Sequence, residues 1–189
     1  MITKEKKYIS PEEYLKFERQ SEEKHEYFNG EVFAMSGASV KHNIISSNLI
    51  ISLGNDLKGT SYLPLGSDMR VYVSVNGLYT YPDVSVFRNE IKLLDEEKDT
   101  ALNPIVIFEI LSKSTQDYDL GGKFKLYRDI PTLEEYVLVS QDNVNVEHYK
   151  KQSDGKWLLE EIKDIQEKIE LDSIDCELKL SDIYNMVKF

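Results

Sequence analysis

One stretch of the sequence constrains the fold more than any other, and it runs Ile105-Val106-Ile107-Phe108-Glu109-Ile110-Leu111. Apart from Glu109, every residue in it is apolar. An almost continuous apolar run of this length is typical of a strand that is covered on both faces. Helical and strand patterns alternate around it along the chain, so we expect an α/β fold with a central mixed β-sheet flanked by helices.

Local signals predict the elements around this strand. Ser10-Pro11-Glu12-Glu13 has the capping serine, the first-turn proline and the returning glutamate of a helix start. Asn29-Gly30 predicts a hairpin turn that pairs Phe28 with Glu31, so that Glu26 and Glu31 share a face. The other expected elements are helices at about 42–57, 119–130 and 179–187, strands at about 61–65, 69–75, 79–87, 134–140, 143–150 and 157–162, and a loop at about 89–103.

Length and composition limit the class of protein. A chain of 189 residues, of which 41% are hydrophobic, suits one domain, which we expect to span residues 1–189. The formal net charge of −11 excludes a broadly basic coat for DNA, although not a local basic patch. Cys176 is the only cysteine, which excludes an internal disulfide and a cysteine-based zinc cluster. Neither a secretory signal nor an apolar run of roughly 20 residues is present, so we expect a soluble cytoplasmic protein.

The charges are distributed unevenly along the chain. Residues 157–182 hold nine acidic and three basic side chains, and we expect a solvated acidic face there. Residues 113–128 hold four basic and two acidic side chains instead. The second segment is therefore the better candidate for contact with a polyanion.

Two carboxylates stand where strands are otherwise apolar. Burial of Glu109 costs free energy unless a cation or hydrogen-bond donors compensate it. Asp83 follows Pro82, and strand parity puts it on the face of Tyr81 and Ser85. Taken alone, each acid has a structural explanation, Asp83 as a turn cap and Glu109 as half of an ion pair with a lysine. Together, two carboxylates from neighbouring strands would suit Mg²⁺, which prefers oxygen ligands.

Helical geometry selects the lysine. If residues 119–130 form a helix, Lys123 falls within the apolar arc, whereas Lys125 faces solvent. An amine on the buried face needs an anion, and Glu109 lies on the strand before it, although Lys123 could also reach past the edge of the core to solvent. Lys113 is the second candidate, because it lies four residues after Glu109 and shares its strand face if the strand continues that far.

The order of these features resembles one group of nucleases. Pro82-Asp83, then Glu109 in a buried strand, then a lysine resembles the PD-(D/E)xK nuclease superfamily. Nearly the whole chain is similar to one branch of it, the Uma-two family of restriction-endonuclease-like proteins. The stretches that carry this resemblance are Glu26-Tyr27-Phe28-Asn29-Gly30-Glu31, His42, Ser67-Asp68-Met69-Arg70-Val71, Tyr81-Pro82-Asp83-Val84-Ser85-Val86, Phe108-Glu109-Ile110-Leu111-Ser112-Lys113-Ser114-Thr115, Tyr118-Asp119-Leu120-Gly121-Gly122-Lys123-Phe124-Lys125-Leu126-Tyr127 and Glu135-Tyr136-Val137-Leu138-Val139.

The resemblance implies a restriction-endonuclease-like sheet and a set of site residues. In the wider superfamily a lysine stands two residues after the second acid, where this chain has Leu111. The Uma-two family is similar in having an apolar residue there and its lysine in the following helix, which corresponds to Lys123. The resemblance also assigns Glu26 and Glu31 to the edge of the site. His42 matches too, although a histidine at a helix start can simply pack against its neighbours.

We therefore expect a Mg²⁺- or Mn²⁺-dependent endonuclease that hydrolyses nucleic acid, with DNA as the favoured substrate. Asp83, Glu109 and a backbone carbonyl near Ile110 would hold the metal, and Lys123 would orient the nucleophile. The alternative is an inactive nuclease-fold module that binds nucleic acid or protein, which the acidic charge favours because DNA affinity depends on phosphate neutralisation. A third reading is a protein that the Glu109 ion pair merely stabilises. Fold analogy suggests a homodimer, because cutting both strands of DNA needs two sites.

Overall fold

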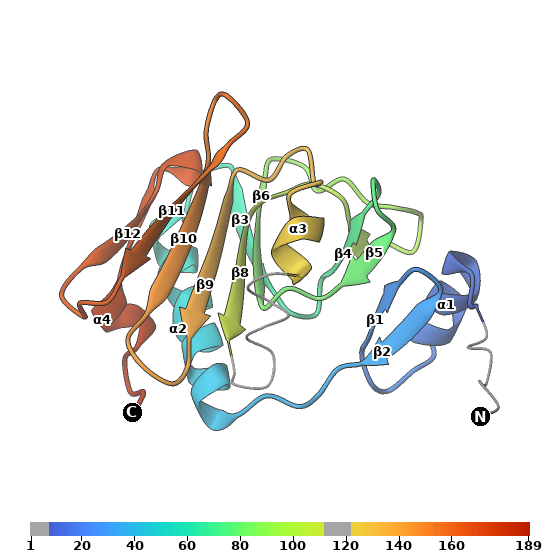
Figure 1. The fold of residues 1–189 in the computed structure, drawn as a ribbon, viewed down its shortest axis with the longest axis horizontal. Coiled ribbons are helices and arrows are strands. Elements are labelled where there is room, and N and C mark those ends of the chain that lie inside the picture. Colours follow the sequence, from blue (N-terminus) through green and yellow to red (C-terminus); the bar gives the residue numbers. More distant parts are fainter. Residues whose placement is uncertain (1–7, 112–121) are drawn as a thin grey trace, which may run out of the picture.

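The structure is a computed structural model that describes residues 8–111 and 122–189 (Figure 1). Its helices are α1 (Pro11–Glu18), α2 (Val40–Asp56), α3 (Phe124–Tyr127) and α4 (Leu180–Ile183), with a 3-10 turn at Asp172–Ile174. Its strands are β1 (His25–Phe28), β2 (Glu31–Ala34), β3 (Tyr62–Gly66), β4 (Arg70–Val73), β5 (Leu78–Thr80), β6 (Val84–Arg88), β7 (Thr100–Ala101), β8 (Pro104–Leu111), β9 (Glu135–Ser140), β10 (Val146–Lys151), β11 (Trp157–Ile162), β12 (Lys168–Leu171) and β13 (Cys176–Lys179). Within these two ranges, no helix is both long enough and apolar enough to cross a membrane.

Six strands form the largest sheet, in the order β11-β10-β9-β8-β6-β3. The strand β8 lies inside it, parallel to β9 and antiparallel to β6. All eight residues of β8 are buried, as its apolar sequence predicts. The sheet is therefore mixed, and the predicted α/β fold with a central mixed sheet is confirmed.

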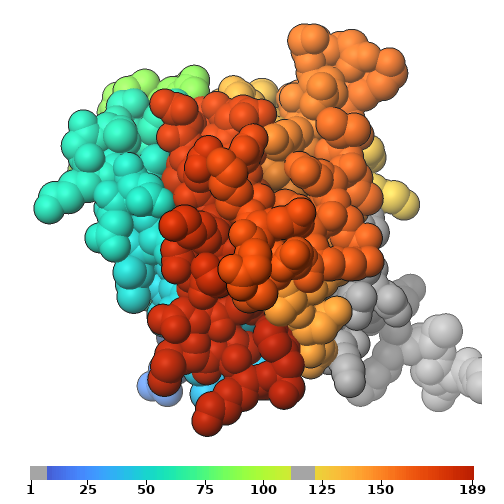
Figure 2. All heavy atoms as spheres, turned by 90° about the vertical axis from the view of Figure 1, so that its left-hand side faces the viewer, coloured from blue at the N-terminus to red at the C-terminus, as the bar shows by residue number. Residues whose placement is uncertain are grey.

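One face of the large sheet is covered by α2, α4 and the β12–β13 hairpin (Figure 1). Ile45, Leu49 and Leu53 form the buried stripe of α2 and belong to the same core as Val106 and Phe108 of β8. Figure 2 shows the C-terminal segments spread over this side of the molecule, with residues of α2 along their edge. This is the principal hydrophobic core of the protein.

The opposite face packs against α3 and a five-stranded sheet with the order β2-β1-β5-β4-β7. Ile107 and Leu111 of β8 share a core there with Val71 of β4 and Tyr127 of α3. Side chains alternate along a strand, so Glu109 points to this side as well. The buried carboxylate therefore lies between the two large sheets rather than under α2.

Local predictions at the N-terminal end are confirmed. Ser10 forms the expected capping box at the start of α1. Asn29 and Gly30 make the β1–β2 turn with positive φ angles of 50° and 83°. The register pairs Phe28 with Glu31, as the turn type requires.

The predicted single strand at 79–87 is wrong. The strand β5 ends at Thr80 and β6 begins at Val84, and the two belong to different sheets. Pro82 has no amide hydrogen with which to continue a ladder, and the chain crosses here from one sheet to the other. Asp83 thus stands at the break, immediately before β6.

Three other segments differ from their prediction. The segment 89–103 contains β7, which pairs in parallel with β4. Of the helix expected at 119–130, residues 119–121 lie outside the described residues, and the helical part of the remainder is the π-helical Gly122 and Lys123 followed by α3. Residues 168–179 form the β12–β13 hairpin with its 3-10 turn, which was not predicted, and only Leu180–Ile183 of the segment 179–187 is helical.

Candidate active site

A cavity of about 750 Å³ is lined by residues of both large sheets and of the start of α2. Among the residues that the structure describes, its charged lining residues are Glu23, Glu26, Asp83, Glu109, Lys24 and Lys123. These four carboxylates and two lysines give the described lining a formal balance of −2. A cavity with this lining favours a cation or a polar ligand over an apolar one.

Asp83 and Glu109 come from neighbouring strands and line the same cavity. In the β6–β8 ladder Val84 pairs with Phe108, so the next position brings Asp83 opposite Glu109. Val84 belongs to the α2 core, and alternation turns Asp83 to the other face. The amide of Ile110 donates a 2.7 Å hydrogen bond to Asp83 Oδ2 and so holds this carboxylate beside β8.

Lys123 lies directly before α3 and is only 6% exposed. Its Nζ lies 3.1 Å from Glu109 Oε1 and 2.9 Å from Glu26 Oε1. Lys125 is exposed, so these two lysines lie on the sides that the helical wheel assigns to them. The buried amine therefore joins carboxylates from the two large sheets.

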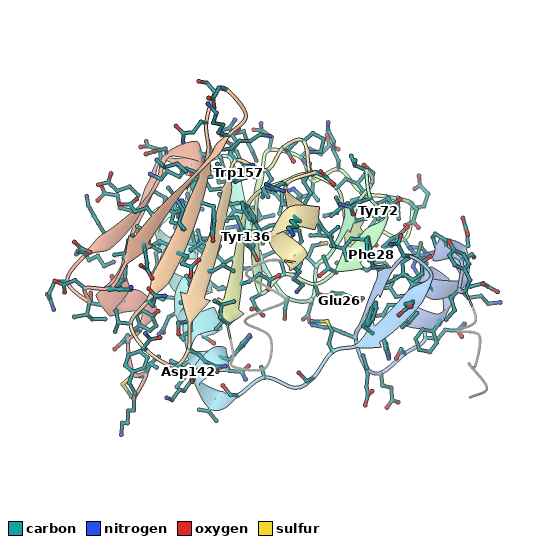
Figure 3. All side chains as sticks on the ribbon, viewed as in Figure 1. Glu26, Phe28, Tyr72, Tyr136, Asp142 and Trp157 are labelled. Carbon is teal, nitrogen blue, oxygen red and sulfur yellow. The ribbon has the colours of Figure 1, made fainter. Side chains whose placement is uncertain are left out.

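Glu26 reaches the cluster from the smaller sheet. It lies on β1, on the side that faces α3 (Figure 3). Thr80 Oγ1 donates a 2.5 Å hydrogen bond to the Oε1 atom that contacts Lys123. The sequence resemblance assigned Glu26 to the edge of the site. In the structure Glu26 contacts Lys123 directly.

His42 approaches Asp83 from α2. Its Nε2 lies 3.1 Å from Asp83 Oδ1. Ser39 caps the helix by accepting a 3.1 Å hydrogen bond from the His42 amide, which fixes the first turn. The Ser39 hydroxyl also donates to Gln141, the residue after β9. His42 thus lines the cavity and does not pack into the α2 core.

Two candidate residues are not placed in this cluster. Glu31 lies on β2 and is not among the described residues that line the cavity. Lys113 lies outside the described residues. Of the two lysines that the sequence offered as partners of Glu109, Lys123 is the one whose contacts the structure describes.

Two hydroxyl groups that sequence reasoning missed also reach the cluster, those of Thr80 and Tyr127. Tyr127 OH donates a 2.7 Å hydrogen bond to Glu109 Oε1. Complete burial, reinforced by the negative charge of Glu109, raises the pKa of Tyr127 well above its usual range, so the phenol keeps its proton. Its spacing of four residues from Lys123 was a usable sequence signal, whereas nothing around Thr80 indicated a role.

The residues of the cavity fit a divalent cation that prefers oxygen. A carboxylate has roughly four lone-pair sites, so the two protein donors on Asp83 do not exhaust it. Among the residues that the structure describes, no three or more His, Cys, Asp or Glu side chains are grouped to hold a metal. A cation here would take one or two carboxylates and complete its shell with backbone oxygen or water, as Mg²⁺ commonly does.

Sequence relatives extend over almost the whole chain. The model of the Uma2 family, described as "Putative restriction endonuclease", matches residues 11–181. One relative, an uncharacterized protein of Synechocystis sp. strain PCC 6803, is 38% identical over 183 residues, which are 96% of this chain and 94% of that protein. Another uncharacterized protein of the same organism is 39% identical over 162 residues, covering 86% of this chain and 92% of its own length.

A solved structure has the same fold. It is a chain from Anabaena variabilis ATCC 29413, described as "a putative nuclease belonging to DUF820", with a TM-score of 0.79 and 19% sequence identity. The match covers 95% of this chain and 99% of that one. The family model and the two relatives settle the family, and the solved structure settles the architecture: this chain belongs to the Uma2 family and has its restriction-endonuclease-like fold.

Proposed function

We propose that this Uma2 protein is a Mg²⁺- or Mn²⁺-dependent endonuclease that hydrolyses phosphodiester bonds in nucleic acid, with DNA as the favoured substrate. The observation that carries the proposal is the meeting of Asp83, Glu109 and Lys123 in one cavity. The description of the family and that of the structural neighbour support the same class of reaction.

Each residue of the cluster has a role in this reaction. Asp83 and Glu109 would hold the cation, which when bound polarises the scissile phosphate and acidifies a water molecule. Lys123 presents a positive charge beside them, where it orients the nucleophile and stabilises charge that develops on the phosphate. Glu26 holds the amine of Lys123 from the other sheet, and His42 holds the Asp83 carboxylate.

The charge of the cavity supports the requirement for a divalent cation. The described part of its lining holds four carboxylates and two lysines, which together repel a phosphodiester. One divalent cation would bring the formal balance of these six residues from −2 to zero. Nucleic acid and cation should therefore enter the site together.

Plasmid nicking tests the proposal. We expect the wild-type protein to nick supercoiled plasmid with Mg²⁺ or Mn²⁺ and to lose this activity in EDTA. Glu109→Gln and Lys123→Met should each lower the rate by roughly 100-fold or more, because one removes a metal ligand and the other a transition-state charge. Glu160→Gln, on the exposed edge strand β11, is the matched control and should leave the rate unchanged. Nicking that survives both site substitutions would remove these residues from the mechanism.

A second candidate function is a non-catalytic module that binds nucleic acid or protein. The net charge of −11 favours it, because phosphate binding depends on neutralising cations. Metal binding separates the two candidates, since an interaction module has no need of Asp83 and Glu109 together. Calorimetric titration with Mn²⁺ that shows no uptake by the wild-type protein would favour the module.

Three broader expectations stay predictions from the sequence, namely a cytoplasmic location, a single domain and a homodimer. The homodimer is the one that bears on the proposed reaction, because two active sites are needed to cut both strands. Size-exclusion chromatography with light scattering measures it directly.

A further inference from the structure

Five buried side chains close a ring of polar contacts beside the cavity, and we call it the polar ring. Its contacts are Tyr127 OH to Glu109 Oε1 at 2.7 Å, Glu109 Oε1 to Lys123 Nζ at 3.1 Å, Lys123 Nζ to Glu26 Oε1 at 2.9 Å, Glu26 Oε1 to Thr80 Oγ1 at 2.5 Å, and Thr80 Oγ1 to Tyr127 OH at 3.3 Å. No member is more than 9% exposed. The ring joins β8, β1 and β5 to α3 and to Lys123, the residue before it.

We propose that Tyr127 and Thr80 are positioning residues, which set the place of Lys123 and the orientation of the Glu109 carboxylate without touching the substrate. This role rests on the proposed nuclease function, because it concerns the geometry of the same site. Lys123 and Glu109 line the cavity, whereas both hydroxyl residues are fully buried behind them and are not among its described lining residues.

The number of hydroxyl protons in the ring determines which hydrogen bonds the two hydroxyl groups can donate. Tyr127 and Thr80 each carry one hydroxyl proton, and each oxygen lies within hydrogen-bond distance of a carboxylate. If both protons point to the carboxylates, none is left for the contact between the two hydroxyl oxygens. That contact is the longest in the ring, at 3.3 Å, which agrees with this arrangement.

The ring holds α3 against β8 from both ends of the helix. Lys123 directly precedes it and Tyr127 is its last residue, and both contact the same atom, Glu109 Oε1. Loss of the phenol hydroxyl would remove the hydrogen bond from the far end of α3 to Glu109 of β8 and allow the carboxylate and the amine of Lys123 to shift.

Packing alone does not require either hydroxyl. Phenylalanine fills the volume of Tyr127, and valine has nearly the shape of threonine. An apolar group of the same shape is often tolerated in a core when no polar partner is left unpaired. Here the partners of the hydroxyls are two carboxylates that both contact the amine of Lys123. The hydroxyls therefore affect the reaction by fixing the orientation of these charged groups.

Steady-state kinetics of plasmid nicking, with Mn²⁺ affinity measured by calorimetry, test this role. Tyr127→Phe should lower kcat by roughly 10- to 100-fold with KM nearly unchanged, and should weaken Mn²⁺ binding by a similar factor, because the ligand carboxylate loses its orienting donor. Thr80→Val should lower kcat in the same range. Thr80→Ser restores the hydroxyl and should recover most of the activity.

The control is Tyr184→Phe. Tyr184 is a buried tyrosine of the opposite core, and its hydroxyl bonds the backbone of Asn145. This variant should lose stability in urea but keep kcat. A second control combines Tyr127→Phe with Lys123→Met, where the tyrosine substitution should add less than about threefold, because the two residues act as one unit.

The possible outcomes are distinct. If the wild-type protein nicks DNA but Tyr127→Phe resembles Tyr184→Phe, or Thr80→Ser falls as far as Thr80→Val, the positioning role is wrong and the proposed function stands. If the wild-type protein neither binds Mn²⁺ nor nicks DNA, the proposed function fails, and the positioning role fails with it.

Discussion

At the scale of single residues, one buried amine connects the carboxylates of the candidate site. Lys123 contacts Glu109 from one sheet and Glu26 from the other, and all three are buried. Moving a charge from water into the protein interior costs free energy, and only an opposite charge with good hydrogen bonds compensates this cost. The three charges therefore compensate one another when buried together, and burying any one of them without the others would destabilise the fold.

Replacing the amine should destabilise the fold as well as the reaction. We expect Lys123→Met to lower the free energy of unfolding by roughly 3–5 kcal/mol, because it leaves two carboxylates buried without their cation. Adding Glu109→Gln and Glu26→Gln to it should recover most of the loss. Urea denaturation measures each difference, and Lys125→Met, at an exposed position, is the control with an expected change below about 0.5 kcal/mol. An unchanged stability of Lys123→Met would mean that the amine is not buried between the carboxylates in solution.

Part of this cluster could be predicted from the sequence because local rules apply to it. The apolar run around Glu109 predicted its burial, and helical phase placed Lys123 on the buried face. His42 was a candidate only through resemblance to a family, and its contact with Asp83 was not predicted. Thr80 could not be found, because its contact with Glu26 joins residues 54 positions apart and no local pattern records it.

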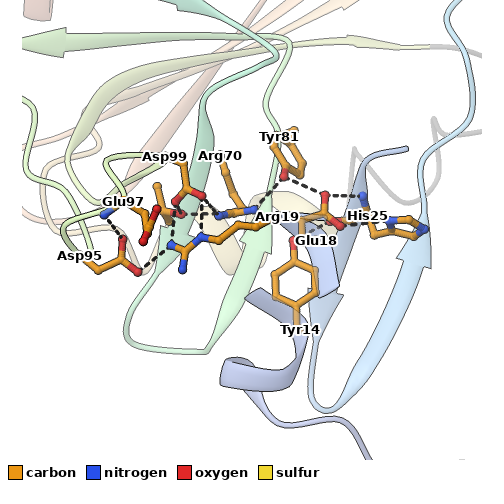
Figure 4. Close-up of polar contacts among 10 residues, drawn as sticks. Tyr14, Glu18, Arg19, His25, Arg70, Tyr81, Asp95, Glu97 and Asp99 are labelled. Carbon is orange, nitrogen blue, oxygen red and sulfur yellow. Dashed lines mark hydrogen bonds and ion pairs between the residues drawn. The ribbon is translucent and has the colours of Figure 1, made fainter. Parts of the chain in front are cut away.

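At the scale of elements, α1 ties together the two segments that carry Glu26 and Asp83. Glu18, near the end of this helix, accepts hydrogen bonds from the His25 amide at 2.9 Å, from His25 Nδ1 at 3.0 Å and from Tyr81 OH at 2.8 Å (Figure 4). His25 is next to Glu26, and Tyr81 lies two residues before Asp83. The buried carboxylate of Glu18 thus joins the segment that carries Glu26 to the segment that carries Asp83.

Arg70 extends this network to the smaller sheet (Figure 4). It donates to Tyr81 OH at 3.0 Å and lies 2.8 Å from Asp99, which also binds Arg19 of the α1 end. The hydrogen bond from Arg19 holds the pKa of Asp99 well below its usual range. The Asp99 carboxylate therefore stays ionised near neutral pH, and its contacts join the end of α1, β4 and the segment before β7.

Glu18→Gln should loosen this connection. A glutamine side chain has one acceptor oxygen where the carboxylate has two, so at least one buried donor loses its partner. We expect a loss of roughly 1–3 kcal/mol in the free energy of unfolding. Hydrogen exchange should also speed up more in β1 and β2 than in β8 and β9, because the hairpin is the part released. Glu22→Gln, at an exposed position, is the control, and equal exchange profiles for the two variants would contradict the role of Glu18.

Elements with a strong local pattern were predictable, and those set by distant contacts were not. The stripe of α2 and the apolar run of β8 each extend over seven residues or more and match the structure. The break at Pro82 was missed because both flanking strands continue the same alternation in sequence, although they pair in different sheets. The β12–β13 hairpin was missed because four-residue strands with every second residue charged resemble an acidic surface.

At the scale of the whole molecule, the acidic segment 157–182 is separated from the cavity. Much of the acidic segment 157–182 forms the β12–β13 hairpin and its neighbours, which cover the α2 side of the large sheet (Figure 2). The cavity lies on the opposite side of that sheet, where α3 ends in the exposed cations Lys125 and Arg128. The excess charge of this segment therefore lies away from the path by which a polyanion would approach the site.

This separation predicts how nucleic-acid binding depends on salt. Few cations of the described residues lie near the cavity. The affinity for a DNA duplex, measured by fluorescence anisotropy with Ca²⁺ in place of Mg²⁺, should therefore fall with a slope of only roughly −2 to −3 in log K against log salt. Lys125→Gln and Arg128→Gln should each flatten that slope by about 0.9, because each removes one phosphate contact. Lys168→Gln, in the acidic hairpin, should leave it unchanged. If Lys168→Gln flattens the slope and the α3 substitutions do not, the nucleic acid binds the other face, and hydrolysis in this cavity becomes untenable.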